Sequence, residues 1–240
     1  MADKNTAAIF DLDGTLVDSA PDLVAALNHT LARRGLPGVE VSVARRFIGH
    51  GARAMIRAGR AAHGAPAPNE REAAADLEAF LAHYRAHIAD ASRPFPGVVA
   101  LLQGLRAAGA PMAVCTNKRE ALAVSLLEAL GLSTYFVTVV GRDTLGVAKP
   151  DPAPAALCKE RTGAPAAVFF GDSDADIGAA VGADMPCLIH EKGYGPLERA
   201  GEAFATFQSY VDASALFDAA SSPSSHATRT GSTQRGSGSA

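Results

Sequence analysis

Five short, continuous apolar runs constrain the fold of this chain more than any other feature. They cover residues 7–12, 111–116, 137–140, 166–170 and 185–189. None of them alternates polar and apolar residues as a half-exposed strand does. Such runs are typical of strands that are buried on both faces of a sheet.

Amphipathic segments separate most of these runs. Leucines at helical spacing occupy residues 122–130, and Gly131 follows where a helix commonly ends. Residues 98–105 show the same pattern, and Gly109 ends it. Strands alternating with helices predict an α/β fold, with a Rossmann-like parallel sheet core and right-handed crossovers.

Residues 20–93 interrupt the alternation, with helical patterns and no convincing strand. An insert that leaves after the first strand and rejoins at residues 94–97 indicates a second, smaller domain on two linkers. We therefore predict an α/β core domain of residues 1–17 and 94–220 and an all-helical domain of residues 18–93. Residues 221–240 contain no Val, Ile, Leu, Met or aromatic residue and predict a disordered Ser/Gly-rich tail.

Composition excludes several kinds of partner. The formal net charge of −3 over 240 residues argues against nucleic acid. The longest stretch without Asp, Glu, Lys or Arg, residues 129–141, is shorter than the ~18 residues that a membrane helix needs. No secretory signal is visible at the N-terminus, and three cysteines without a CxxC spacing predict free thiols and a cytoplasmic location.

Polar residues follow four of the apolar runs. In a parallel sheet the carboxyl ends of the strands meet at one edge, where ligands bind. Carboxylates that converge there repel one another unless a cation lies between them, and all-oxygen ligands suit Mg²⁺. Each short motif alone also fits a turn, a loop or a helix cap. Their occurrence together, in this order and at the ends of the predicted strands, favours a single functional site. The residues concerned are Asp11, Asp13, Gly14, Thr15, Thr116, Asn117, Lys149, Asp172, Asp174 and Asp176.

These residues resemble the motif set of the haloacid dehalogenase-like phosphatases. Asp11-Leu12-Asp13-Gly14-Thr15-Leu16-Val17-Asp18-Ser19 resembles the first motif. Thr116 fits the second motif, Lys149 the third, and Gly171-Asp172-Ser173-Asp174-Ala175-Asp176 the fourth. The resemblance covers about residues 6–218, and it implies that the helical insert is the cap which this superfamily carries between its first two motifs.

The resemblance also implies a role for each residue. Asp11 is the expected nucleophile and forms an aspartyl-phosphate. Asp13 is expected to act as general acid and base, and its presence favours phosphate esters over the halides of dehalogenases. The expected Mg²⁺ ligands are Asp11, the backbone carbonyl of Asp13, Asp172 and, directly or through water, Asp176. Thr116, the Asn117 amide and Lys149 are expected to hold the phosphoryl oxygens.

Within the superfamily the chain is most similar to the bacterial phosphoglycolate phosphatases. The similarity lies in residues 47–53, 115–118, 141–145, 149–154 and 193–195. It implies hydrolysis of 2-phosphoglycolate to glycolate and phosphate by a monomer or homodimer. His50 and Arg53, in a glycine-flanked part of the insert, are expected to reach the substrate.

Other interpretations remain open. A phosphatase or phosphomutase acting on a sugar phosphate or a pyrophosphate shares parts of the same motifs. A phosphoacceptor signalling domain also uses acidic residues, a Thr and a Lys, but is shorter and carries its phosphorylated Asp after a different strand. A non-catalytic binding domain on the same fold is the third alternative. His83 and His87 have helical metal-binding spacing, but no third ligand is spaced to match them.

Overall fold

The computed structural model describes residues 5–222. Most of the predicted tail, residues 223–240, lies outside the described residues. The described chain forms a six-stranded sheet in the order β5-β4-β1-β6-β7-β8, and every neighbouring pair is parallel. The strands are β1 (Thr6–Phe10), β4 (Met112–Cys115), β5 (Thr138–Val140), β6 (Ala166–Gly171), β7 (Cys187–His190) and β8 (Ala205–Phe207). This sheet confirms the predicted α/β core.

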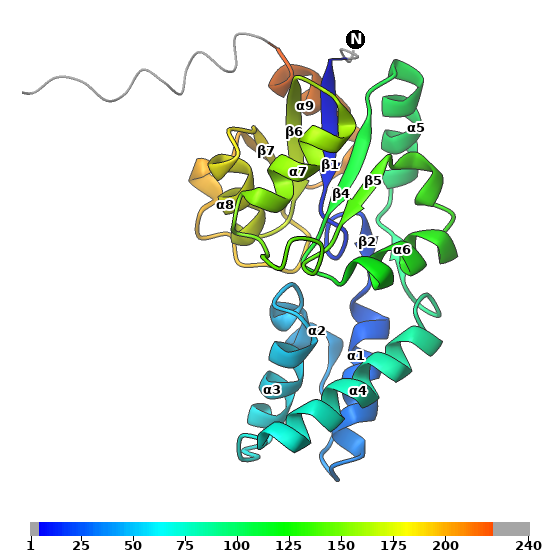
Figure 1. The fold of residues 1–240 in the computed structure, drawn as a ribbon, viewed down its shortest axis with the longest axis vertical. Coiled ribbons are helices and arrows are strands. Elements are labelled where there is room, and N and C mark those ends of the chain that lie inside the picture. The colour runs from blue at the N-terminus through cyan, green and yellow to red at the C-terminus, as the bar shows by residue number, and fades with distance from the viewer. Residues whose placement is uncertain (1–4, 223–240) are drawn as a thin grey trace, which may run out of the picture.

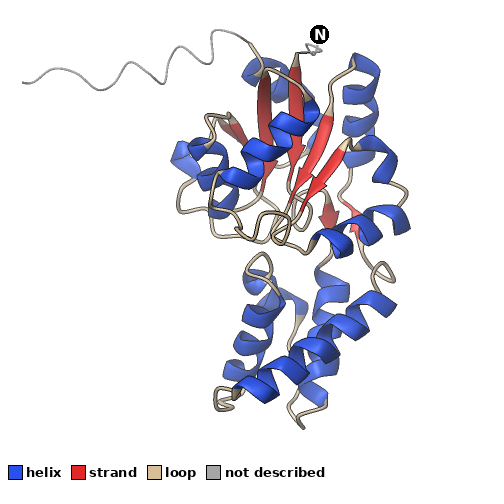
Figure 2. Cartoon of the chain, in the orientation of Figure 1, coloured by secondary structure: helices blue, strands red, loops and turns tan. Residues whose placement is uncertain are grey.

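Helices cover both faces of the sheet (Figures 1 and 2). Alternate residues of each strand point to opposite faces, so Phe10 and Phe170 pack with helices α5, α6 and α9, whereas Ile9 and Phe169 pack with α7 and α8. All four of these side chains are fully buried. The helices are α5 (Val98–Ala108), α6 (Glu120–Ala129), α7 (Ala153–Thr162), α8 (Asp174–Gly182) and α9 (Tyr210–Ala220). Continuous apolar strands therefore reflect burial on both faces, as the sequence predicts.

The insert between β1 and β4 is helical and lies beyond the carboxyl ends of the strands (Figure 1). Its main helices pack on one another around a separate hydrophobic cluster that includes Leu27, Phe80 and Tyr84. Short helices and turns connect the rest. The helices are α1 (Ala20–Ala32), α2 (Val41–Ala44), α3 (Ala52–Ala62) and α4 (Glu70–Ala86).

Two crossing segments join the insert to the sheet. β2 (Val17–Asp18) pairs antiparallel with β3 (Arg93–Pro94), so the outgoing and returning chains lie side by side. The carboxylate of Asp22, at the start of α1, accepts hydrogen bonds from the backbone N–H groups of Ala91 and Ser92. These two bonds tie the start of the outgoing helix α1 to the returning segment that leads into β3.

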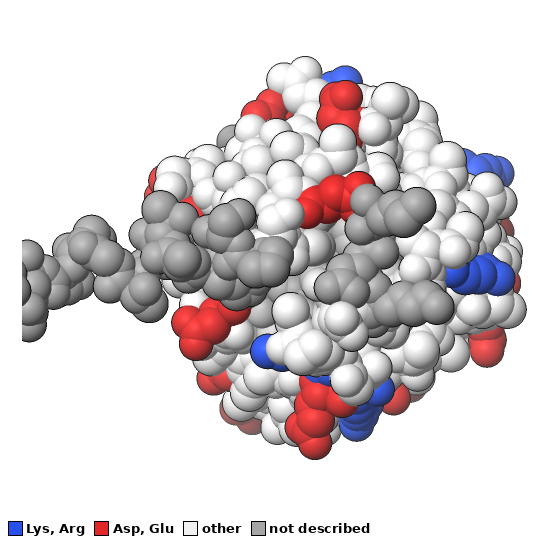
Figure 3. All heavy atoms as spheres, turned by 90° about the horizontal axis from the view of Figure 1, so that it is seen from above, with Lys and Arg blue, Asp and Glu red and all other residues white. Residues whose placement is uncertain are grey.

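The surface adds one observation about partners. Figure 3 looks down on the end of the molecule that lies opposite the insert, and it shows acidic and basic side chains scattered over a mostly uncharged face. Basic side chains do not gather there into a stripe among the described residues. None of the helices within residues 5–222 is both long and apolar enough to cross a bilayer.

Candidate active site

The turn after β1 brings the first acidic motif against the end of β6. Thr15 is fully buried, and its hydroxyl donates a hydrogen bond of 3.0 Å to Oδ1 of Asp172. Gly14 has a φ of +91°, and a Cβ there would lie 2.3 Å from Oδ2 of Asp172. Only glycine combines this backbone conformation with so close an approach. The tight turn therefore holds the carboxylate of Asp172 in contact with Gly14 and Thr15 of the acidic motif.

Asp176 fixes the opposite side of the site. It lies in the first turn of α8, where its Oδ2 accepts from the Ser173 hydroxyl at 2.6 Å and from the backbone N–H groups of Asp172 and Ser173 at 3.1 Å each. This is a capping box with aspartate in place of the usual glutamate. The carboxylate therefore holds the loop that carries Asp172.

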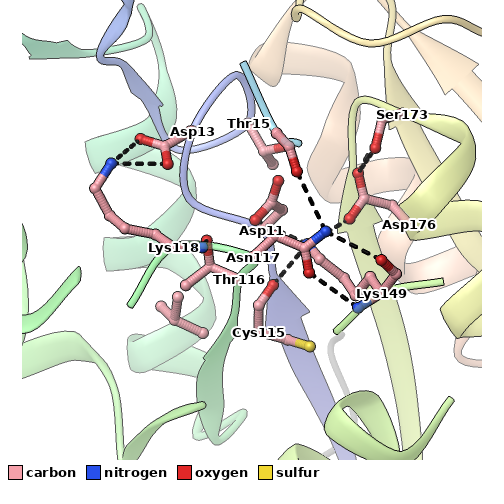
Figure 4. Close-up of polar contacts among 12 residues, drawn as sticks. Asp11, Asp13, Thr15, Cys115, Thr116, Asn117, Lys118, Lys149, Ser173 and Asp176 are labelled. Atoms are coloured by element: carbon pink, nitrogen blue, oxygen red, sulfur yellow. Dashed lines mark hydrogen bonds and ion pairs between the residues drawn. The ribbon is translucent and has the colours of Figure 1, made fainter. Parts of the chain in front are cut away.

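Lys149 connects two of the acidic side chains, those of Asp11 and Asp176 (Figure 4). Its Nζ lies 2.8 Å from Oδ1 of Asp11 and 2.6 Å from Oδ1 of Asp176. It also donates to the backbone carbonyl of Cys115 at 2.8 Å. Burial alone would lower the pKa of Lys149, but the charges of Asp11 and Asp176 raise it above its ordinary value. Its ammonium therefore stays charged throughout the physiological range.

The carboxylates outnumber the positive charge that Lys149 supplies to them. Burial raises the pKa of Asp11 to about 7, with Lys149 opposing and Asp176 adding to the shift. Burial and the neighbouring carboxylates Asp176 and Asp11 likewise raise the pKa of Asp172 well above its usual range. The fold thus keeps carboxylates together in a place where a further positive charge would stabilise their ionised forms.

The acidic group fits a divalent cation. Each of Asp11, Asp172 and Asp176 offers a carboxylate oxygen, and these oxygens all lie within 4.8 Å of one another. Oxygen donors of this kind suit hard cations such as Mg²⁺. Both oxygens of Asp176 accept hydrogen bonds from Lys149 or within the α8 turn, and both oxygens of Asp172 accept hydrogen bonds from Thr15 and Tyr194. A cation held here would therefore share these carboxylates with their present donors.

The end of β4 supplies the next predicted residues. Thr116 is buried beside Asp11 and lines the same cavity. The side chain of Asn117 donates to the backbone carbonyl of Lys149 at 3.1 Å and accepts from its N–H at 2.9 Å. It also donates to the carbonyl of Gly49 in the insert at 3.3 Å. Asn117 therefore positions Lys149 and contacts the insert through its side chain, which leaves its backbone N–H for a ligand.

Asp13 lies apart from the other carboxylates. Figure 4 shows its side chain pointing to Lys118, and the Lys118 Nζ lies 2.7 Å and 2.8 Å from its two oxygens. The Ser19 hydroxyl donates to the same carboxylate at 2.5 Å. The sequence interpretation assigned no role to Lys118, although it directly follows Thr116-Asn117 in a segment that carries the resemblance.

Two further residues that the sequence interpretation did not assign hold these loops. The backbone N–H of Tyr194 donates to Oδ2 of Asp172 at 2.7 Å, and its hydroxyl donates to Asp18 at 2.5 Å. His190, buried at the end of β7, bonds through Nδ1 to the carbonyl of Gly14 at 3.0 Å. Burial lowers the pKa of this imidazole, so the neutral ring is favoured and its Nδ1–H can donate. A lone His or Tyr carries no sequence signal for such a role.

Two adjoining cavities lie between the sheet and the insert. The first, of about 320 Å³, is lined by Asp11, Thr116, Lys149 and His50. The second, of about 440 Å³, is lined by apolar side chains of the insert and by Arg53. Both cavities share Asp13, Asn117, Lys118 and Arg142 in their walls. His50 therefore reaches the cavity of the acidic group, whereas Arg53 lines the neighbouring one.

Comparison with known proteins connects this geometry to a family. A family model described as haloacid dehalogenase-like hydrolase matches residues 6–184. A phosphoglycolate phosphatase of Caulobacter vibrioides is 46% identical over 195 residues, which cover 80% of this chain and 82% of the relative. One from Mesorhizobium japonicum is 43% identical over 190 residues, with 78% and 82% covered.

Solved structures agree with these sequence matches. The crystal structure of a predicted phosphoglycolate phosphatase from Haemophilus somnus superposes with a TM-score of 0.81 at 28% identity. The superposition covers 89% of this chain and 98% of that one. A putative phosphoglycolate phosphatase from Lactobacillus delbrueckii gives a TM-score of 0.80 at 26% identity, with 90% and 99% covered.

Proposed function

Because the chain belongs to the haloacid dehalogenase-like hydrolases, we propose that it is a phosphoric monoester hydrolase that converts 2-phosphoglycolate to glycolate and phosphate. The observation that carries this proposal is the convergence of Asp11, Asp172 and Lys149 at the carboxyl ends of the strands. Phosphoryl transfer depends mostly on positioning and charge neutralisation, and this group supplies both.

Asp11 is the nucleophile in this proposal. Its carboxylate attacks phosphorus, the bond to the ester oxygen breaks, and an aspartyl-phosphate forms. Water then attacks the phosphorus of this intermediate and releases phosphate. Lys149, at 2.8 Å from Asp11, balances charge as the phosphoryl group arrives, and Thr116 with the Asn117 N–H holds its oxygens.

Asp13 is the general acid and base. Protonated Asp13 gives its proton to the departing glycolate oxygen, and the carboxylate formed in that step then takes a proton from the attacking water. Both transfers require the side chain to turn away from Lys118, which holds it in this structure.

Mg²⁺ is the proposed cofactor. Asp11, Asp172 and the backbone carbonyl of Asp13 would hold it, with Asp176 supporting Asp172 through the α8 turn. When bound, the ion neutralises the carboxylates and a phosphoryl oxygen. The raised pKa values of Asp11 and Asp172 support this assignment, because burial and, after it, the neighbouring carboxylates disfavour the ionised forms that a bound cation would stabilise.

The helices of residues 18–93 are proposed to act as a cap domain. They lie over the site, and the two cavities are formed between them and the core. Closure of such a cap would exclude water from the reacting phosphoryl group. His50 and Arg53 are its proposed contributions to substrate binding, and Arg suits a carboxylate because its fork can bond both oxygens.

Phosphate release from a panel of esters tests the function. The panel holds 2-phosphoglycolate, ethyl phosphate, a hexose phosphate, pyrophosphate and p-nitrophenyl phosphate, each with Mg²⁺ and with a chelator. We expect the highest kcat/KM with 2-phosphoglycolate and no turnover in chelator. A preference for the hexose phosphate or pyrophosphate would favour the related phosphatase or phosphomutase alternative. No release from any ester would favour the signalling or binding alternatives.

Arg53→Ala tests the cap contribution separately. It should lower kcat/KM for 2-phosphoglycolate by about tenfold or more, the value of a charged hydrogen bond, and change p-nitrophenyl phosphate turnover much less. Equal losses with both esters would show that Arg53 supports the cap rather than the substrate.

Location and assembly are further parts of the proposal. Cys115, Cys158 and Cys187 are all buried, and none of the three forms a disulfide, which supports a reducing, cytoplasmic location. A monomer or homodimer remains the expected assembly, and sedimentation would distinguish the two.

A further inference from the structure

Lys118 and Asp13 form a shielded ion pair at the boundary between the core and the insert. The Lys118 Nζ lies 2.7 Å and 2.8 Å from the two oxygens of Asp13, and the side chains are only 5% and 11% exposed. The same Nζ lies 4.9 Å from the centre of the Tyr84 ring on α4. The ammonium is thus enclosed by a carboxylate of the core and an aromatic face of the insert.

This pairing keeps Asp13 away from the reacting groups. In Figure 4 the carboxylate of Asp13 points to Lys118, whereas Asp11 and Asp176 gather around Lys149. A carboxylate held by two short contacts to an ammonium is not free to reach the leaving oxygen of an ester. Asp13 must therefore exchange this partner before it can act.

The proposed substrate carries a group that can take the place of Asp13. 2-Phosphoglycolate carries its carboxylate directly on the carbon that bears the ester oxygen, so its two charged ends are close together. Lys118 lines both the cavity of the acidic group and the neighbouring cavity under the insert. Within residues 5–222, Asp13 is the carboxylate with which Lys118 forms an ion pair. A substrate carboxylate entering between the cavities would compete directly for that ammonium.

We propose that Lys118 is a specificity residue, whose ammonium exchanges the carboxylate of Asp13 for that of the substrate and so releases Asp13 to turn toward the leaving oxygen. No covalent bond changes in this exchange, because one carboxylate replaces another on the same ammonium. The substrate's charge thereby contributes to the rate of the chemical step as well as to binding. The inference rests on the proposed function and names the residue that couples recognition to catalysis.

The first experiment uses the wild-type chain with Mg²⁺. It compares 2-phosphoglycolate with 2-phosphoglycolamide, in which a neutral amide of similar size replaces the carboxylate. The proposal expects kcat to fall by about tenfold or more with the amide, because Asp13 stays on Lys118. A higher KM with unchanged kcat would overturn it, since the carboxylate would then serve binding alone.

The second experiment uses variants of Lys118. Lys118→Met should reduce the ratio of kcat/KM for 2-phosphoglycolate to that for ethyl phosphate by about 10- to 100-fold. Lys118→Arg keeps the charge and should recover part of the ratio. Lys159→Met, which removes a cation on α7 that lines neither cavity, is the matched control and should leave the ratio unchanged. An unchanged ratio in Lys118→Met would overturn the proposal, even if both activities fell.

The two proposals fail in different ways. If the wild-type chain hydrolyses 2-phosphoglycolate no better than ethyl phosphate, the proposed substrate is wrong. If it prefers 2-phosphoglycolate and Lys118→Met keeps that preference, only the role of Lys118 is wrong. Lys118→Met removes the partner of a carboxylate that is only 11% exposed and so puts folding at risk. If the variant does not fold, the wild-type comparison of acid and amide still tests the inference.

Discussion

At the residue scale, the site depends on which carboxylate each lysine holds. Lys149 contacts Asp11 and Asp176, and Lys118 contacts Asp13. The two aspartates of the first motif are thus separated by their partners although they are two residues apart in the sequence. This separation suits the different roles that we propose for them.

Asp11→Asn tests the nucleophile. The amide keeps the shape of the side chain but cannot attack phosphorus, so phosphate release from 2-phosphoglycolate should fall to background. The melting temperature should stay near that of the wild type or rise, because the variant removes a buried charge from a crowded acidic group. Residual turnover at an appreciable fraction of the wild-type rate would contradict a covalent mechanism through Asp11.

Asp13→Asn tests the general acid. A leaving alkoxide needs a proton much more than p-nitrophenolate does, and general acid catalysis contributes about 10²- to 10⁴-fold. The variant should therefore lose more activity with 2-phosphoglycolate than with p-nitrophenyl phosphate. Steady-state rates with both esters check this, and equal losses would remove Asp13 from that role.

At the scale of elements, a buried ion pair holds the insert helices together. Asp76 of α4 is 3% exposed, and its carboxylate lies 3.1 Å from Arg60 of α3 and 2.7 Å from Arg34 just beyond α1. One side chain thus joins the three main helices of the insert at the end remote from the core. The cavity under the insert depends on these helices keeping their spacing.

Asp76→Asn should lower the free energy of unfolding by ~3 kcal/mol, because it leaves the buried guanidinium of Arg60 with only the more distant and more exposed Glu72, at 4.0 Å, as its countercharge. Chemical denaturation measures the loss. Asp90→Asn is the control, since the Asp90 side chain is 66% exposed and its removal should have little effect. Equal small changes in both variants would mean that apolar packing alone holds the helices.

At the scale of the whole molecule, the buried acidic group couples stability to pH and to metal. Burial raises the pKa of Asp11 from 3.8 to about 7 and raises that of Asp172 as well. Between these values the folded chain retains protons that the unfolded chain has released. The contribution of Asp11 to the free energy of unfolding therefore decreases as the pH rises from about 4 to about 7, and the raised pKa of Asp172 acts in the same direction.

Mg²⁺ should oppose this loss, because it binds the ionised carboxylates of the folded chain. We expect it to raise the melting temperature more at about pH 8 than at about pH 5, where protons compete with the metal. Thermal unfolding in Mg²⁺ and in chelator at both pH values checks the prediction, with Asp172→Asn as the variant that should lose the difference. An equal effect at the two pH values would contradict it.

The sequence by itself determined the core sheet and the acidic group. Five apolar runs predicted five of the six strands that form the main sheet within residues 5–222, because burial on both faces leaves a clear local pattern. Strand β8 was not predicted, since its three residues at the sheet edge are too few for a pattern. Asp11, Thr116, Lys149 and Asp172 were predicted from their places after strands, and parallel strand ends necessarily meet at one edge.

Only the tertiary structure decided which groups pair across the boundary between core and insert. Lys118 meets Asp13 over a separation of 105 residues, and Tyr84 encloses the pair from a third segment. In the insert, the rings of His29 and His83 stack with their centres 4.4 Å apart. The spacing of His83 and His87 along the chain did not indicate that His29 would be their neighbour. These contacts depend on how helices pack on one another and on the core. Periodicity reports which face of an element is buried, but it does not identify the side chain that the face will meet.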